Sequence, residues 1–223
     1  MEAAWQEKKL ILLVVEAVIG KTRLMLEFAA SKGAFELTGG RPGDAITPFA
    51  TVTRTIENLL EHYPSVMLPN WVRRELARLV PKLTDEPSTA IVSLEERGRF
   101  FTAFAELVQQ IAQNIATLLC DDMQFFDASS LEMAFAATQR FVQLADKRCI
   151  AAFRRFDLTP EVNAMLETYV QNGQAVLIEI EPLAETDFLE MVEDFSTSRS
   201  SLLFGQRLRC NSAMNCAGRK AER

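Results

Sequence analysis

The sequence predicts an α/β fold with a mainly parallel, five-stranded sheet. Short apolar runs alternate with segments of helical periodicity up to about residue 195, and this alternation is typical of parallel sheets covered by helices. The first apolar run, residues 9–15, is continuous and β-branched, as in a strand buried on both faces. The residues with functional chemistry follow the expected strands, and sheets of this kind bind ligands beyond the carboxyl ends of their strands.

The expected strands share an apolar or β-branched character and are bounded by polar or turn-forming residues. They cover residues 9–15, 34–38, 115–120, 148–153 and 174–180. The expected helices carry apolar side chains near helical spacing or begin at capping residues. They cover about residues 22–31, 47–62, 71–79, 93–111, 128–145, 159–171 and 185–194. The helices between the second and third strands form an insertion over about residues 41–114.

Three helix starts are marked by local signals. Thr47 and Thr159 each precede a proline, which places a capping threonine before a proline at the first helical position. Ser93 is followed three residues later by Glu96, and this spacing predicts a capping box. We therefore expect helices to begin at these three places.

The bulk composition is that of an ordinary globular protein. The chain has 223 residues, of which 48% are hydrophobic and 24% are charged, enough for one sizeable core. From Ser196 onward the sequence is polar at first and lacks sustained periodicity. We therefore expect one domain over residues 1–195 and a poorly ordered tail over residues 196–223.

The charge, the apolar runs and the cysteines of the chain argue against several functional classes. A net charge of −6 argues against direct nucleic-acid binding by this segment, because such binding needs a basic face. No apolar run approaches the ~20 residues of a membrane span, and the first run ends too soon for a secretory signal. Cys120 and Cys149 lie in apolar runs and are expected to be reduced core residues. We expect a cytoplasmic protein without membrane partners.

The loop after the first strand ends in Gly20-Lys21-Thr22 and leads into a helix. Strand, loop and helix with this ending form the layout of a phosphate-binding P-loop, in which backbone N–H groups and a helix N-terminus hold phosphates. The lysine reaches the β- and γ-phosphates and the threonine hydroxyl binds Mg²⁺. The residues expected to bind nucleotide form one segment: Glu16, Ala17, Val18, Ile19, Gly20, Lys21, Thr22 and Arg23.

Two further motifs follow the third and fourth strands. Asp121 and Asp122 come directly after an apolar strand; one carboxylate can hold Mg²⁺ and the next can orient or deprotonate a water. Arg154 follows the fourth strand, where a cation can stabilise charge that develops on a γ-phosphate. Taken locally, the acids could instead be helix-capping or loop residues, and Arg154 could equally be a surface arginine. All three motifs are expected to meet at the carboxyl edge of the sheet.

The P-loop pattern departs from its usual form at two positions. A full motif begins with a glycine where this chain has Val15, and a β-branched residue tolerates a positive φ poorly. Val18 adds bulk near the expected phosphate position. Two interpretations follow: a nucleotide-binding module, and a degenerate P-loop module that binds no nucleotide and acts as an interaction scaffold.

These segments resemble an AAA-like P-loop ATPase module of the STAND class, as found in large ATP-binding LuxR-type regulators and multidomain cyclase or kinase relatives. Val15–Leu24 is similar to the family stretch Gly-Glu-Ala-Gly-Ile-Gly-Lys-Thr-Arg-Leu. Asp121–Leu131 is similar to Asp-Asp-Leu-Gln-Trp-Ala-Asp-Pro-Ala-Ser-Leu, and Ala151–Arg154 to Ala-Thr-Tyr-Arg. The similarity spans about residues 9–195.

The resemblance implies a three-layer P-loop NTPase fold with ATP and Mg²⁺ as ligands. It implies that Lys21 and Thr22 bind phosphate and Mg²⁺, that Asp121 binds Mg²⁺, and that Asp122 and Arg154 serve hydrolysis as water-orienting residue and γ-phosphate sensor. The function it implies is a regulatory switch in signal transduction or transcription regulation, with weak ATPase activity where the altered loop is functional. Other protein domains or self-association would supply its partners, and the chain would be a truncated or divergent piece of a larger regulator.

Overall fold

The computed structural model describes residues 1–15, 20–86, 93–144 and 147–180. The chain divides into two units, Met1–Pro182 and Leu183–Arg223, and the described residues all belong to the first. The helix expected near residues 185–194 and the tail expected over residues 196–223 lie outside the described residues. Those two expectations, and the boundary at residue 195, stay predictions.

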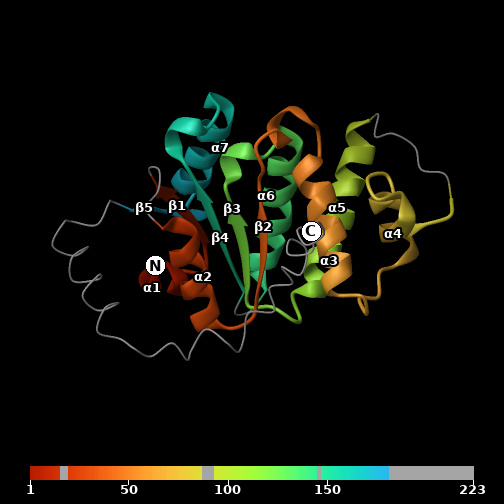
Figure 1. Ribbon diagram of the computed structural model, residues 1–223, viewed down its shortest axis with the longest axis horizontal. Helices are drawn as coiled ribbons and strands as arrows, with labels where there is room; N and C mark the ends of the chain where they lie inside the picture. Colours follow the sequence, from red (N-terminus) through yellow and green to blue (C-terminus); the bar gives the residue numbers. More distant parts are fainter. Residues whose placement is uncertain (16–19, 87–92, 145–146, 181–223) are drawn as a thin grey trace, which may run out of the picture. The chain divides into compact units, whose positions relative to one another are not determined.

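A five-stranded parallel sheet forms the centre of the first unit (Figure 1). In spatial order its strands are β2 (Phe35–Gly39), β3 (Thr117–Asp121), β4 (Arg148–Phe153), β1 (Leu10–Val15) and β5 (Ala175–Ile180). All four pairings between these strands are parallel. The predicted α/β class with a parallel five-stranded sheet is therefore confirmed. The order places β4 between β1 and β3, so the carboxyl ends of these three strands lie side by side.

Helices cover both faces of the sheet. The described helices are α1 (Glu2–Gln6), α2 (Lys21–Lys32), α3 (Ala50–His62), α4 (Asn70–Leu76), α5 (Leu94–Ile111), α6 (Ala128–Gln143) and α7 (Pro160–Gln171). Short 3₁₀ turns are η1 (Asp44–Ile46), η2 (Pro81–Leu83), η3 (Met123–Phe125) and η4 (Arg155–Asp157). Within the described part of the chain, no helix has the length and apolar character needed to cross a membrane.

The side chains of β1 alternate between two hydrophobic clusters. Ile11 and Leu13 pack with α1 and α2 on one face, whereas Leu12 and Val14 pack with α6 and α7 on the other. All four side chains are buried. A strand that is covered on both faces needs apolar side chains at every position, which explains the continuous apolar run that the sequence shows.

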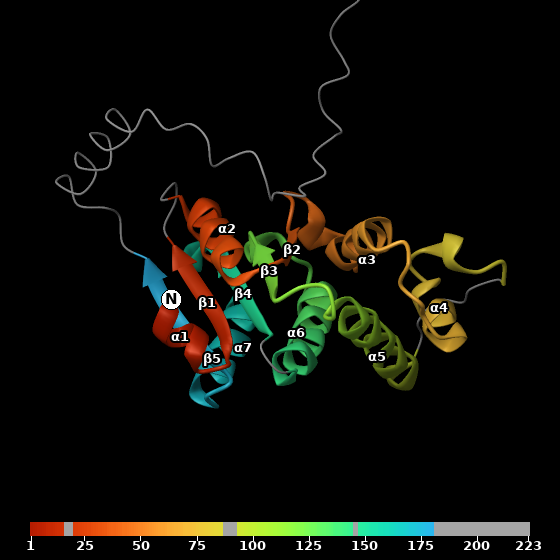
Figure 2. The ribbon, with the colours of Figure 1, turned by 90° about the horizontal axis from the view of Figure 1, so that it is seen from below.

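The predicted helical insertion between β2 and β3 is confirmed. It consists of α3, α4 and α5, and α5 packs against α6 at the side of the sheet (Figure 2). Its core includes Ile56, Leu76 and Phe100, which are fully buried. The insertion therefore has its own hydrophobic core, which α6 shares with the central fold.

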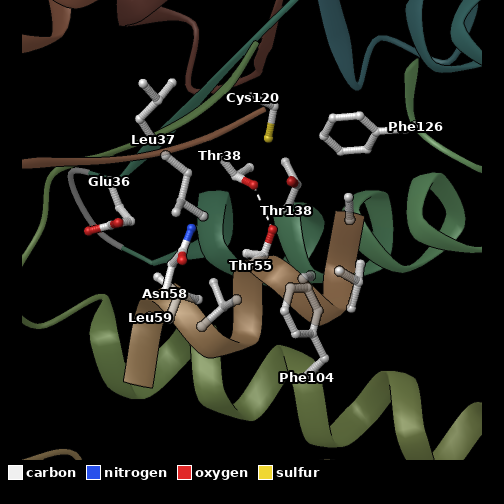
Figure 3. A pocket seen from close by; sticks show the side chains of 15 residues that line it. Glu36, Leu37, Thr38, Thr55, Asn58, Leu59, Phe104, Cys120, Phe126 and Thr138 are labelled. Carbon is white, nitrogen blue, oxygen red and sulfur yellow. Dashed lines mark hydrogen bonds between the residues drawn. The ribbon is translucent and has the colours of Figure 1, made fainter. Parts of the chain in front are cut away.

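A small cavity lies where the insertion meets β2 and β3 (Figure 3). Its volume is about 40 Å³, and its wall is mostly apolar, with Leu37, Phe104 and Phe126 among the lining residues. The hydroxyl groups of Thr38 and Thr55 are hydrogen-bonded across it at 2.6 Å. Ligand pockets usually enclose about 300–1,000 Å³, so this cavity is too small for a nucleotide.

Two of the three predicted helix starts are confirmed. Ser93 and Glu96 form the expected capping box, with both side-chain-to-backbone hydrogen bonds at 3.1 Å. Thr159 caps α7 by accepting a hydrogen bond from the N–H of Val162, with Pro160 at the first helical position.

The predicted start at Thr47 is wrong, because α3 begins at Ala50 after Phe49. Phe49 has a left-handed backbone with φ 61°. Its N–H donates to Oδ1 of Asp127 at 2.9 Å, and its ring packs edge-on against that of Phe100, with the centroids 5.6 Å apart. These contacts to distant parts of the chain fix the turn at Phe49 and override the local capping signal.

Candidate functional site

The segments that carry the predicted site meet at the carboxyl edge of β1, β4 and β3. β1 ends at Val15 and α2 begins at Lys21, so the phosphate-binding loop expected at residues 16–19 connects them. β3 ends at Asp121, and Arg154 follows β4 directly. Because β4 lies between the other two strands, the acidic residues and the lysine approach one another across the end of β4.

The central contacts of the site join Lys21 and Thr22 to the two aspartates. Nζ of Lys21 lies 2.6 Å from Oδ1 of Asp121 and 2.6 Å from Oδ1 of Asp122. The hydroxyl of Thr22 donates to Oδ2 of Asp121 at 2.5 Å. The side chains of Lys21 and Asp121 are only 11% and 10% exposed. Water screens such a pair less than it screens a surface ion pair, so the attraction is stronger.

Gly20 stands at the junction of the loop and α2. It is the N-cap residue, with φ 77° and ψ 20°, a left-handed conformation that glycine adopts without steric cost. Gly20 has no side chain with which to cap the helix, so α2 begins without a side-chain cap. The N–H groups at such a helix start can bind an anion, and the helix dipole favours negative charge there.

Val15, which occupies the place of the first P-loop glycine, is the last residue of β1 and pairs with Ile180 of β5. Strand backbone is a conformation that β-branched residues favour. The prediction that Val15 would conflict with a positive φ at this position is therefore wrong. Val18, at the second altered position, lies outside the described residues.

The acidic turn after β3 has an unusual backbone that a neighbouring glycine accommodates. Asp122 has φ 50° and ψ 45°, in the left-handed region that aspartate visits more readily than most residues. The N–H of Gly40 donates to the backbone carbonyl of Asp121 at 3.0 Å. A Cβ atom on Gly40 would lie 2.5 Å from the carbonyl oxygen of Asp122. The acidic turn and the end of β2 can approach this closely only because residue 40 is glycine.

Gln124 links the acidic turn to the end of β4. Its Nε2 donates to Oδ1 of Asp122 at 2.9 Å, and its Oε1 accepts a hydrogen bond from the backbone N–H of Arg154 at 3.2 Å. Gln124 and Gly40 were not among the site residues predicted from the sequence. The available signals were the place of Gln124 in the Asp-Asp-Met-Gln block and the Gly-Gly pair at the end of β2.

The environment of Asp122 favours its ionised form. Burial by itself raises the pKa of this carboxyl group, but hydrogen bonds from Lys21 and Gln124, together with the charges of Lys21 and Arg154, outweigh it. The net effect lowers the pKa of Asp122 below its ordinary value. At neutral pH the site therefore contains a carboxylate that can accept hydrogen bonds, for example from a water.

Two predicted site residues stand apart from these contacts. The guanidinium of Arg154 is 44% exposed and lies 3.7 Å from a carboxylate oxygen of Asp157; its backbone reaches the site through Gln124. Arg23 pairs along α2 with Glu27, at 2.7 Å. Glu16, Ala17, Val18 and Ile19 lie outside the described residues, so their expected contacts with nucleotide stay predictions.

The donor groups fit a phosphate together with Mg²⁺. A hydroxyl and a carboxylate are the hard oxygen ligands that Mg²⁺ prefers, and a lysine at a helix start suits a phosphate. The described residues contain no group of three or more histidine, cysteine, aspartate or glutamate side chains that could hold a metal. Mg²⁺ usually takes one or two protein carboxylates and completes its shell with phosphates and waters, and Asp121 together with Thr22 could supply the protein ligands.

Comparisons with known proteins give a likeness to solved structures only. No protein-family model matches the chain, and no curated protein matches it. A DNA replication initiation factor is similar with a TM-score of 0.45 and 14% identity, covering 87% of this chain and 47% of that one. AMPPCP-bound DnaA from Aquifex aeolicus is similar with a TM-score of 0.42 and 14% identity, covering 90% and 49%.

A third similar structure is that of Drosophila ORC bound to AT-rich DNA and Cdc6. Its TM-score is 0.41 at 10% identity, covering 89% of this chain and 61% of that one. The chain thus spans about half the length of the first two structures. Likenesses of this strength assign no family, substrate or partner to the chain.

The expectation that this segment makes no direct contact with nucleic acid is corrected, because its reason does not hold; the third comparison still assigns no nucleic-acid partner to this chain. A protein with this likeness occurs in a complex with AT-rich DNA. The expectation rested on the net charge of −6, which averages over the whole surface. Nucleic-acid binding requires only a local basic face, so the net charge does not exclude it.

Proposed function

We propose that this chain binds ATP with Mg²⁺ at the carboxyl edge of the sheet and acts as a regulatory switch module. The observation that carries the proposal is the contact of Lys21 with Asp122 and of Thr22 with Asp121, across 101 and 99 residues of sequence. These four side chains are the groups that a phosphate and its Mg²⁺ require: an ammonium, a hydroxyl and two carboxylates beside a helix start.

Each group has a role in this proposal. Lys21 binds the β- and γ-phosphates, and Thr22 and Asp121 hold Mg²⁺, whose charge when bound would offset that of the phosphate oxygens. Asp122 is ionised and orients a water, or accepts a proton from it. Arg154 can turn from Asp157 toward the γ-phosphate, because its side chain is exposed and its backbone is anchored beside Asp122. The ATPase activity would be weak.

The finer part of the proposal concerns the protein class. The resemblance of Asp121–Leu131 to the STAND block supports a module of a signalling or transcription regulator, in the cytoplasm, with other protein domains or a second copy as partner. ATP would favour one conformation and its hydrolysis another. The domain would extend over residues 1–195, with the insertion at about 41–114.

Titration calorimetry with a slowly hydrolysed ATP analogue and Mg²⁺ tests the proposal. The variants are Lys21→Ala and, as a matched control, Lys32→Ala, which removes the same charge from the other end of α2. Lys32 pairs with Glu2 at 2.7 Å, away from the aspartates. We expect micromolar binding by the wild type and by Lys32→Ala, and none by Lys21→Ala. Undiminished affinity in Lys21→Ala, or no heat from folded wild type, contradicts the proposal.

A second candidate function is that of an interaction scaffold without nucleotide. Two observations favour it: Val18 stands where the related loops have glycine, and Lys21 is already neutralised by two carboxylates. The variant Val18→Gly, alone and combined with Val15→Gly, separates the two candidates. Nucleotide affinity that appears only in these variants would identify a site that the valines have disabled.

A further inference from the structure

The ammonium group of Lys21 lies between the two carboxylates that the proposed function assigns to Mg²⁺ and water. It is 2.6 Å from Oδ1 of Asp121 and 2.6 Å from Oδ1 of Asp122. The hydroxyl of Thr22 holds Oδ2 of Asp121, and Gln124 donates to Oδ1 of Asp122. Both oxygens of Asp121 and one of Asp122 therefore already have donors within the chain.

We propose that Lys21 is an internal counter-ion of Asp121 and Asp122, which keeps a divalent cation out of the site until a phosphate draws the ammonium away. The role of the phosphate rests on the proposed function, whereas the exclusion of the cation rests on the contacts alone. Lys21 then has two alternative partners: the two aspartates when no phosphate is bound, and the phosphate when one is bound. Cation and nucleotide would consequently bind with positive cooperativity.

Electrostatics explains the exclusion. A divalent cation that entered between the carboxylates would lie within a few ångströms of the ammonium, where like charges repel each other. The side chains of Lys21 and Asp121 are about nine-tenths buried. Removing the ammonium leaves the carboxylates of Asp121, which is 10% exposed, and of Asp122, which is 35% exposed, without their shared counter-ion. Such a pair has a strong tendency to bind another cation.

Gln124 accounts for how the acidic turn keeps its shape when Lys21 leaves. It donates to the same oxygen of Asp122 that Lys21 contacts, and it accepts from the backbone N–H of Arg154. The amide therefore retains Asp122 against the end of β4 after the lysine moves. Gly40 supports the turn from the other side through its hydrogen bond to the carbonyl of Asp121.

A titration with Mn²⁺ in the absence of nucleotide tests this inference, with the EPR signal of the free ion as the measure of binding. The variants are Lys21→Met and the matched control Lys32→Met, which removes the same charge from the far end of the same helix. We expect Lys21→Met to bind Mn²⁺ about tenfold or more tightly than the wild type, because the repelling charge is gone. Lys32→Met should match the wild type. Adding Asp122→Asn to Lys21→Met should abolish most of the gain.

The folding of Lys21→Met provides a second test of the inference. If Lys21→Met is unfolded in EDTA by circular dichroism, recovery of the folded signal on addition of Mn²⁺ supports the inference, and failure to recover contradicts it. The variant Lys21→Gln keeps a hydrogen-bond donor without the charge, and it should show the same gain in Mn²⁺ affinity. Equal or weaker Mn²⁺ binding by folded Lys21→Met and Lys21→Gln overturns the inference.

The two proposals can fail separately. A gain of Mn²⁺ affinity in Lys21→Met, with no binding of an ATP analogue by the wild type, retains the counter-ion and rejects the nucleotide site. Wild-type nucleotide binding that is lost in Lys21→Met, with Mn²⁺ affinity unchanged between the two proteins, retains the nucleotide site and rejects the counter-ion.

Discussion

Nζ of Lys21 lies 2.6 Å from Oδ1 of Asp122, although 101 residues separate the two in the sequence. The contact depends on the strand order, which places only β4 between β1 and β3. The ends of β1 and β3 are therefore close enough for a lysine side chain to connect them. It joins two motifs that the sequence could identify only separately.

Gly40→Ala should destabilise the protein and weaken the site. Its Cβ would lie 2.5 Å from the backbone carbonyl of Asp122, so the acidic turn must shift, at a cost of about 1–3 kcal/mol. Urea unfolding measures the loss, and titration with an ATP analogue measures the effect on the site.

The control for Gly40 is Gly98→Ala. Gly98 lies in α5 with no atom near its added Cβ, so alanine there should stabilise the helix by up to about 1 kcal/mol. Equal changes in the free energy of unfolding for the two substitutions would show that the close approach at Gly40 does not affect stability.

Gln124→Leu should lower ATP turnover more than nucleotide affinity. The variant removes the donor to Asp122 and the acceptor for the N–H of Arg154, so the water-orienting carboxylate loses its fixed position while Lys21 and Thr22 are unaltered. Each lost hydrogen bond costs about 1 kcal/mol. Steady-state phosphate release gives turnover and calorimetry gives affinity; a loss confined to affinity would contradict the role of Gln124.

Asp44→Asn should destabilise the protein at neutral pH and much less in acid. The hydrogen bonds from Arg54 lower the pKa of Asp44; burial opposes them, and the N–H of Arg41 and the hydroxyl of Thr51 add to the lowering. A carboxyl whose folded pKa is lowered stabilises the fold above its unfolded pKa of about 3.9 and loses this contribution as the pH falls through the folded value.

Urea unfolding at several pH values measures this effect. At pH 7 we expect the free energy of unfolding of the wild type to exceed that of Asp44→Asn by about 1–3 kcal/mol. This difference should become smaller as the pH falls below about 4. Glu57→Gln serves as a control, since Glu57 is exposed and its nearest cation, on Lys82, is 3.9 Å away. A gap for Asp44→Asn that stays constant with pH would refute the ionic contribution.

Phe100→Ala should destabilise the insertion strongly. Phe100 is fully buried in the core that α3, α4 and α5 share with α6, and truncating a buried phenylalanine costs about 3–5 kcal/mol. Thermal unfolding measures the loss. Phe156→Ala is the matched control, because Phe156 is 82% exposed and its removal should change stability by less than about 0.5 kcal/mol.

The sequence by itself determined the α/β class, the approximate strands and helices, and four of the side chains that meet at the candidate site: Lys21, Thr22, Asp121 and Asp122. Apolar periodicity and the Gly-Lys-Thr ending are local properties, so they can be read without knowing what packs against them. The resemblance to a P-loop module identified the same residues. The net charge, in contrast, did not decide whether nucleic acid can bind, because it carries no information about where charges lie.

The tertiary structure alone decided the strand order, the contact between Lys21 and Asp122, and the supporting roles of Gly40 and Gln124. It also moved the start of α3 from Thr47 to Ala50, since Asp127 and Phe100 hold Phe49 in a left-handed turn. Each of these features depends on groups far apart in the sequence, and their free energy exists only once the chain has brought those groups together. Local propensity contains no information on such contacts, so the sequence could name single residues of the site but not their arrangement or the groups that support it.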